Sequence, residues 1–136
     1  MYLLKRLIFC ILIILQSCSA PTYPPVENPL DAGRQFAEAV FKGNFERAGQ
    51  LIVPDAENKR LLRQRLEDVY HQRNSADRNQ MAQASLQIQN VEDVVKDSMI
   101  LIRLINAYDG KPAVLKVIKN NNNWLVDLKH TFSGNR

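Results

Sequence analysis

The spacing of the apolar residues changes near residue 84, and this change constrains the fold more than any other feature of the sequence. From residue 29 to about residue 73 the apolar residues recur at intervals of three and four, as in an amphipathic helix. From about residue 84 onward they alternate with polar residues, as in a strand with one buried face. The sequence therefore predicts an α+β domain with N-terminal helices packed on an antiparallel sheet.

Three helices are expected in the first part of the domain. Asn28, followed by a proline, can cap the first helix, and Gly43 ends it. Asn44 restarts a short second helix, and Asp55 caps a third helix that runs to about residue 73. Residues 74–83 are polar and are expected to form a loop.

Four strands are expected near residues 84–91, 98–108, 112–119 and 123–132. The first of these is rich in glutamine and asparagine, which fits the solvated face of an edge strand. Asp109-Gly110 is typical of a two-residue hairpin turn, in which both residues have positive φ. That turn pairs Leu104 with Leu115, and a four-residue loop at 120–123 pairs Val117 with Val126. The helix-facing apolar side then contains Ile102, Leu104, Leu115, Val117, Val126 and Leu128.

The other, convex side of the sheet carries both charged and apolar residues. The same register places Lys116 opposite Asp127 as an ordinary ion pair on a solvated surface. Several apolar residues on this convex side also need a cover. They are Leu101, Ile105, Val114, Ile118 and Leu125.

The N-terminus has the features of a leader. Two basic residues precede an apolar run over residues 7–15, which is too short to span a bilayer and is typical of a signal peptide. Leu15-Gln16-Ser17-Cys18 resembles the lipobox of bacterial lipoproteins, which implies removal of residues 1–17 and lipidation of Cys18. The alternative is an ordinary signal peptide cut near Ser17 or Ala20. Ser19 suggests, by the sorting preference of Gram-negative lipoproteins, the outer membrane facing the periplasm.

The mature chain then carries no free thiol, because Cys10 lies in the leader and Cys18 carries the lipid. A disulfide and a thiolate metal site are therefore not expected. Residues 18–28 are rich in proline and are expected to be an extended tether, followed by the domain at 29–136. Removal of the leader leaves 16 of the 18 basic residues against 14 acidic ones, which argues against nucleic-acid binding.

Residues 29–132 are expected to form three helices before an antiparallel meander, and they contain the stretches PLDAGRQFAEAVFKGNFERAGQL and WLVDLKHTF. In these features, residues 29–132 resemble small lipoproteins of the nuclear transport factor 2-like superfamily. This resemblance implies a curved, cone-like sheet wrapped around a long helix, often with a pocket at its open end. The superfamily hosts isomerases, dehydratases, transport adaptors and binding domains, so function does not follow from the fold. It also often dimerises through the convex sheet face. The residues that carry the resemblance are Lys42, Gly43, Asn44, Ala48, Leu51, Trp124, Val126, Asp127 and Leu128.

Three residues are candidates for binding a ligand in such a cone. The register places His130 on the helix-facing side, level with Asn106 and near Tyr108. The alternative is that His130 is a half-exposed edge histidine with no ligand. No acidic residue falls on this face of the last three strands, which weakens any acid–base pair.

No HExxH, Walker, GxGxxG or GxSxG motif is present, so no catalytic residue, metal site or cofactor is expected.

The first hypothesis for function is a non-enzymatic, lipid-anchored binding or accessory domain of the cell envelope. The second is a small-molecule-binding domain or pocket enzyme of the isomerase or dehydratase kind. The expected partners are the membrane, through Cys18, and an envelope protein or a second copy through the convex face. The two hypotheses differ in whether the interior encloses a polar cavity of roughly several hundred Å³ or is filled by Phe36, Phe41, Tyr70 and Trp124.

Overall fold

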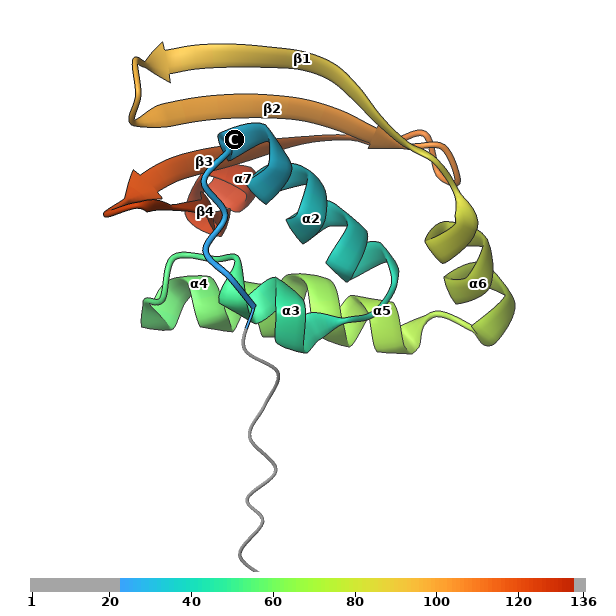
Figure 1. Cartoon of the computed structure of the whole chain (residues 1–136). Coiled ribbons are helices and arrows are strands. Elements are labelled where there is room, and N and C mark those ends of the chain that lie inside the picture. The colour runs from blue at the N-terminus through green and yellow to red at the C-terminus, as the bar shows by residue number, and fades with distance from the viewer. Residues whose placement is uncertain (1–22, 134–136) are drawn as a thin grey trace, which may run out of the picture.

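The computed structural model describes residues 23–133, so the predicted signal peptide and Cys18 lie outside the described residues. Helices flank a four-stranded antiparallel sheet of order β1-β2-β3-β4, which confirms the α+β class. The sheet is not strongly curled or closed (Figure 1). The elements are α2 (Pro29–Phe41), α3 (Phe45–Gln50), α4 (Ala56–Leu61), the π-helical η1 (Leu62–Glu67), α5 (Asp68–Gln72), α6 (Ser75–Gln83), β1 (Leu86–Val95), β2 (Met99–Asn106), β3 (Pro112–Asn120), β4 (Asn123–Asp127) and α7 (Leu128–Ser133).

The three predicted helix starts are confirmed, and each has a side-chain cap. The Asn28 side chain accepts hydrogen bonds from the backbone N–H groups of Leu30 and Asp31 at 2.9 and 3.2 Å. Asn44 caps α3 and Asp55 caps α4 in the same way. The predicted third helix is one rod made of α4, η1 and α5.

The prediction of a loop at 74–83 is wrong, because residues 75–83 form α6. The Asn74 side chain accepts a hydrogen bond from the backbone N–H of Asp77 at 2.8 Å and so begins the helix. In α6 only Met81 is buried, so the helix carries no apolar stripe that a periodicity argument can detect.

The β2–β3 pairing keeps the predicted faces but differs in register. Ile102 lies opposite Leu115 and Leu104 lies opposite Ala113, which is a shift of two residues from the predicted pairs. A shift of two leaves every side chain on its predicted face, because side chains alternate with a period of two. The prediction of a two-residue turn with positive φ at both residues was wrong, since Gly110 has φ +64° but Asp109 does not have positive φ.

The β3–β4 pairing confirms Val117 opposite Val126 and Lys116 opposite Asp127. The strand ends at Asp127, however, and the prediction that it continues to residue 132 is wrong. The Asp127 side chain accepts a hydrogen bond from the backbone N–H of Lys129 at 3.2 Å, which favours the start of a helix at Leu128.

The outer edge of β4 is covered by the chain between α3 and α4. The backbone N–H of Val126 donates to the carbonyl of Leu51 at 2.8 Å, and that of Val53 donates to the carbonyl of Val126 at 3.0 Å. Ile52 forms a parallel bridge with Val126. Val26 also docks here, because the backbone N–H of Trp124 donates to its carbonyl, and Val26 is itself buried.

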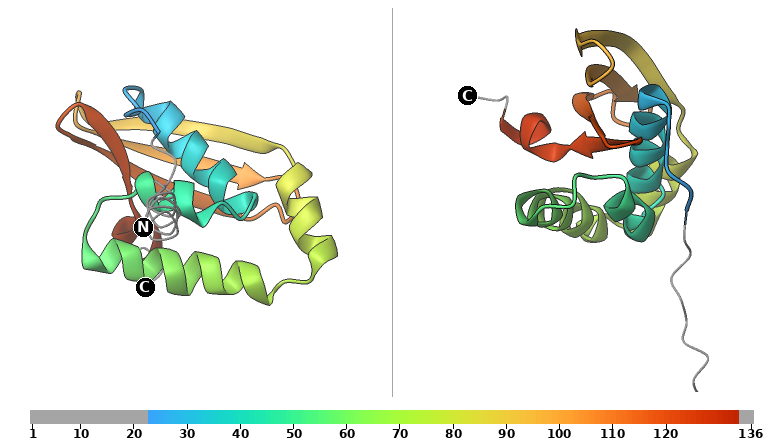
Figure 2. Two further views of the ribbon diagram at one scale, coloured as in Figure 1. Left: turned by 60° about the horizontal axis from the view of Figure 1, so that its bottom comes forward. Right: turned by 60° about the vertical axis from the view of Figure 1, so that its left-hand side comes forward.

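The core lies between the sheet, α2 and the helical rod, because all three contribute to the buried cluster (Figures 1 and 2). Gly33 lets α2 approach the sheet closely, since a Cβ at this position would collide with the Ile102 side chain. Gly43 ends α2 with φ +72°, a conformation that glycine adopts without steric cost. All six residues predicted for the helix-facing side are buried: Ile102, Leu104, Leu115, Val117, Val126 and Leu128.

Candidate functional site

Asn106 and Tyr108, two of the three candidate ligand-binding residues, join the β2–β3 turn to α6. Asn106 is buried, and its amide nitrogen donates to the carbonyl of Met81 at 3.3 Å. Its amide oxygen accepts from the backbone N–H of Tyr108 at 2.8 Å. The Tyr108 hydroxyl donates to Asp77 at 2.8 Å, and this hydrogen bond raises the pKa of Tyr108. These contacts stabilise the turn, and a role of either residue in ligand binding stays a prediction.

His130, the third candidate, does not lie on the helix-facing side of the sheet. It belongs to α7 and is exposed, so its predicted placement beside Asn106 was wrong. The error follows from the early end of β4, since the expected alternation of side chains stops where the helix starts. The structure therefore brings Asn106 and Tyr108 together but does not place His130 on the same strand face.

The interior space beneath α2 is small and apolar. It measures about 80 Å³, against roughly 300–1,000 Å³ for small-molecule pockets. Thr131 supplies a hydroxyl to its wall, and that hydroxyl donates to the carbonyl of Val114 at 2.9 Å. The other lining side chains include Phe36, Val40, Leu66, Leu104, Leu115 and Phe132. The space therefore has no converging polar groups to orient a substrate.

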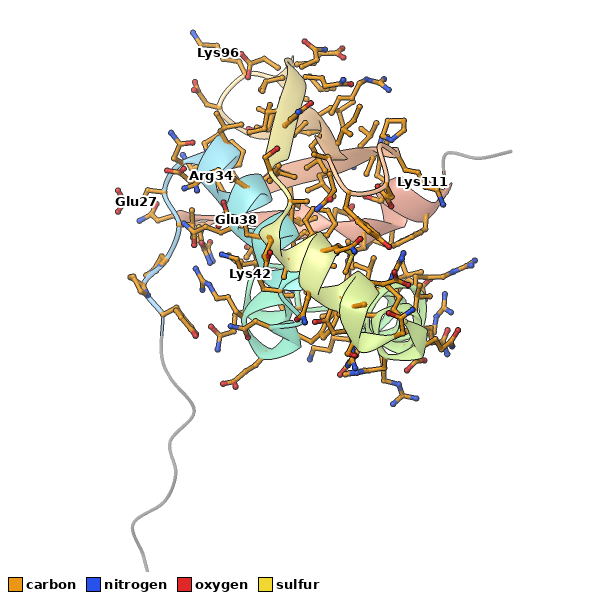
Figure 3. The ribbon with its side chains drawn as sticks, turned by 90° about the vertical axis from the view of Figure 1, so that its right-hand side faces the viewer. Glu27, Arg34, Glu38, Lys42, Lys96 and Lys111 are labelled. Atoms are coloured by element: carbon orange, nitrogen blue, oxygen red, sulfur yellow. The ribbon has the colours of Figure 1, made fainter. Side chains whose placement is uncertain are left out.

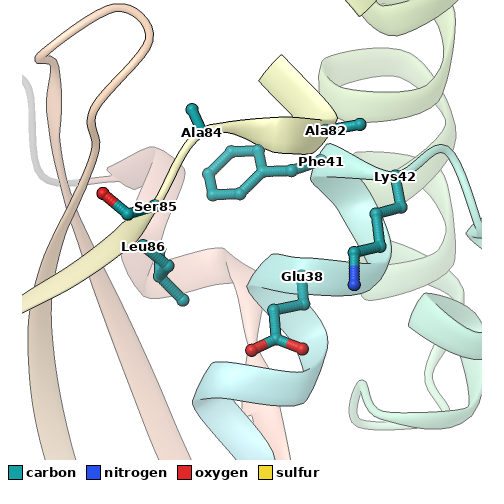
Figure 4. Close-up of a pocket in the computed structure, with 7 residues that line it drawn as sticks. All are labelled: Glu38, Phe41, Lys42, Ala82, Ala84, Ser85 and Leu86. Atoms are coloured by element: carbon teal, nitrogen blue, oxygen red, sulfur yellow. The ribbon is translucent and has the colours of Figure 1, made fainter. Parts of the chain in front are cut away.

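A second hollow, of about 260 Å³, opens between the end of α2 and the start of β1 (Figure 4). Glu38 and Lys42 line it from α2, and Phe41 and Leu86 supply an apolar wall. Glu38 already accepts a hydrogen bond from Arg34 at 3.0 Å, within an exposed pair on α2. The two charged residues have opposite sign and lie on one open wall, so the hollow does not favour a particular class of ligand.

A buried polar network joins α4 to the end of β4. Asn58 is fully buried, and its side-chain nitrogen donates to Asp55 at 2.9 Å and to Asp127 at 3.3 Å. Its side-chain oxygen accepts from the backbone N–H of Leu128 at 2.7 Å. Lys129 reaches Asp55 at 2.7 Å, and Lys116 reaches Asp127 at 3.7 Å.

Asp127 is buried in this network, so the prediction that it lies on a solvated surface was wrong. Every buried side-chain nitrogen and oxygen of the described residues has a hydrogen-bond partner. A network in which every group is satisfied favours a structural role over a catalytic one. Within residues 23–133, no cluster of histidine, cysteine, aspartate and glutamate side chains could hold a metal ion.

Acidification should weaken the fold through Asp55. The backbone N–H of Asn58 and the ammonium group of Lys129 both donate to this carboxylate, and they lower the pKa of Asp55 to about 2. Because the folded pKa lies below the ordinary value, the stabilisation is present above about pH 4 and is lost as the pH falls through 2. We expect Asp55→Asn, which keeps a capping side chain, to unfold more easily than wild type in urea at pH 7. The difference should shrink towards pH 2, and a difference independent of pH would contradict this assignment.

Four exposed apolar side chains lie on one strand, β1. Ile88, Val91, Val94 and Val95 are 37, 43, 46 and 47% exposed. β1 is the outermost strand of the sheet, and no segment of the described chain pairs with its outer edge. This confirms the predicted edge strand, but the sequence suggested a polar surface rather than an apolar one.

Three comparisons with known proteins found no relative: no family model, curated protein or solved structure matches this chain. Among the described residues, no helix is both long enough and apolar enough to cross a membrane.

Proposed function

We propose that this chain is a lipid-anchored lipoprotein of the cell envelope that acts as a non-enzymatic binding or accessory domain. The leader pattern and Cys18 support the anchor, and Ser19 supports the outer membrane facing the periplasm. These residues lie outside the described part of the chain. The proposal includes a relationship to the nuclear transport factor 2-like superfamily, supported by the order of helices and strands.

The observation that carries the binding role is the exposed apolar edge of β1. Soluble domains bury or protect such edges, because an unpaired strand with apolar side chains adds readily to another chain. β4, the other outer strand, is covered by residues 51–53 and by Val26. β4 is covered by backbone pairing, whereas β1 has only its two bulges and its charged residues as protection, and this difference supports β1 as the surface that receives a partner.

The alternative function, a small-molecule-binding domain or pocket enzyme, requires a cavity with converging polar groups. The apolar space of about 80 Å³ beneath α2 lacks such groups. A dimer through the convex face is a further proposal for the partner. There Leu101, Ile105, Val114 and Ile118 are partly buried, and Leu125 is buried.

A photoreactive amino acid placed at Val94 should form a covalent adduct with an envelope protein in irradiated cells. The same amino acid at Val69 should not, although Val69 on α5 is 42% exposed and Val94 is 46% exposed. The two positions are matched in residue type and accessibility, and they differ in that Val94 lies on the unpaired strand. Adducts would be detected by immunoblot and identified by mass spectrometry. Equal adducts at both positions, or none at Val94, would contradict the proposal.

A further inference from the structure

We infer that the outer edge of β1 receives an extended segment of another protein that carries two adjacent basic residues, and that this segment adds a fifth strand to the sheet. The inference rests on the proposed function, since it names the class of partner for that surface. Strand addition uses main-chain hydrogen bonds for affinity and alternate side chains for specificity.

The apolar side chains of β1 offer contacts on both faces of an added strand. Ile88 and Val91 lie opposite Leu104 and Ile102 and share their helix-facing side. Val95 lies opposite Met99, on the convex side. An added strand with apolar residues at alternate positions would cover the helix-facing group, because such residues share one face, and its other face would lie beside Val95.

Two neighbouring carboxylates give this edge its charge. Glu92 lies opposite Leu101 on the convex side, and Asp93 lies opposite Ile100 on the helix-facing side. Both residues are exposed, and neither makes an ion pair within residues 23–133. A partner strand with two successive basic residues would place one cation on each face, beside each carboxylate.

The basic residues around β1 leave these carboxylates unneutralised. Arg34 on α2 is already paired with Asp31 and Glu38 at 3.2 and 3.0 Å. Lys96 lies in the turn after β1 and points outward from the tip of that turn (Figure 3). Arg103 lies opposite Asn90, which is two residues from Glu92 on the same convex side, and forms no ion pair in the described chain.

A second copy of this chain fits the edge poorly. Bulges at Gln89 and Val94 interrupt the alternation of side chains along β1. Antiparallel pairing of β1 with its own copy, centred on Val91 or on Glu92, would bring the two carboxylates of each copy together at one edge without placing a cation opposite either of them. Like charges brought together in this way are destabilising. The charge pattern therefore favours a basic partner over self-association.

The test uses two fluorescent ten-residue peptides of alternating threonine and valine, with either two lysines or two glutamates at the centre. We expect the lysine peptide to bind the full lipid-anchored chain in detergent roughly tenfold more tightly than the glutamate peptide, by fluorescence anisotropy. Binding should slow hydrogen exchange within residues 86–95, because an added strand pairs with the outer edge of β1.

Charge reversal provides the matched control. The double variant Glu92→Lys and Asp93→Lys should bind the glutamate peptide more tightly than the lysine peptide. The double variant Glu46→Lys and Asp68→Lys changes the net charge equally on α3 and α5, and it should keep the wild-type preference.

Several results would overturn the inference. These are equal binding of the two peptides, no binding of either, exchange slowed outside β1, or self-association through β1. If neither peptide binds β1 while the photo-adduct at Val94 persists, the inference of a basic partner strand is wrong and the proposed binding function stands. If both experiments fail, the proposed function fails as well.

Discussion

Replacing Cys18 by serine should abolish incorporation of labelled palmitate and leave the leader uncleaved. The lipobox resemblance implies that lipid is attached to the thiol before cleavage, and a serine hydroxyl does not replace a thiol in that attachment. Incorporation would be measured by metabolic labelling and processing by electrophoretic mobility. The expected effect is complete loss rather than a reduction.

The other cysteine provides the matched control for this experiment. Cys10 lies in the predicted apolar run of the leader, so Cys10→Ser should keep both the label and the cleavage. Label retained on the Cys18 variant would refute lipidation at this residue and with it the proposed anchor. Each buried CH₂ group of an acyl chain contributes roughly 0.8 kcal/mol, so two or more chains would hold the protein stably at the membrane.

Replacing Asn58 by alanine should lower the free energy of unfolding by about 3 kcal/mol. The side chain is fully buried, donates to Asp55 and Asp127, and accepts from the backbone N–H of Leu128. Alanine would leave the Leu128 N–H without this acceptor and Asp127 without one of its donors. Urea unfolding at neutral pH would measure the change.

Asn74 provides a comparison of the same residue type. It is exposed and caps α6 through the backbone N–H of Asp77, so Asn74→Ala should cost only about 1 kcal/mol. If the two variants lose the same stability, the Asn58 side chain contributes no more than an ordinary helix cap and its link to β4 contributes little. If Asn58→Ala is as stable as wild type, the network has no structural role.

Some of the candidate site was predictable from the sequence and some was not. The edge position of β1 followed from its polar residues, but Val94 and Val95 lie beyond the predicted end of that strand. Asn58 lies three residues after the capping Asp55, which signals a helix start but not a contact with a strand 69 residues later. His130 was misplaced because Asp127, which caps α7, also fits the alternation of a strand residue opposite Lys116.

The sequence by itself determined the local features of this protein. Caps such as Asn28, Asn44 and Asp55 act within a few residues, and the period of two decides which side chains share a face. These interactions depend on neighbours along the chain, so they can be derived without knowing the fold.

Only the tertiary structure decided the rest. The β2–β3 register differs by two residues from the predicted one although the faces are unchanged, because both registers bury the same apolar side and packing selects between them. Likewise, the outer edge of β4 is covered because residues 51–53 pair with Val126, whereas no described segment pairs with the outer edge of β1. Such pairings join segments far apart in the chain, and their energies depend on contacts that no local pattern of residues encodes.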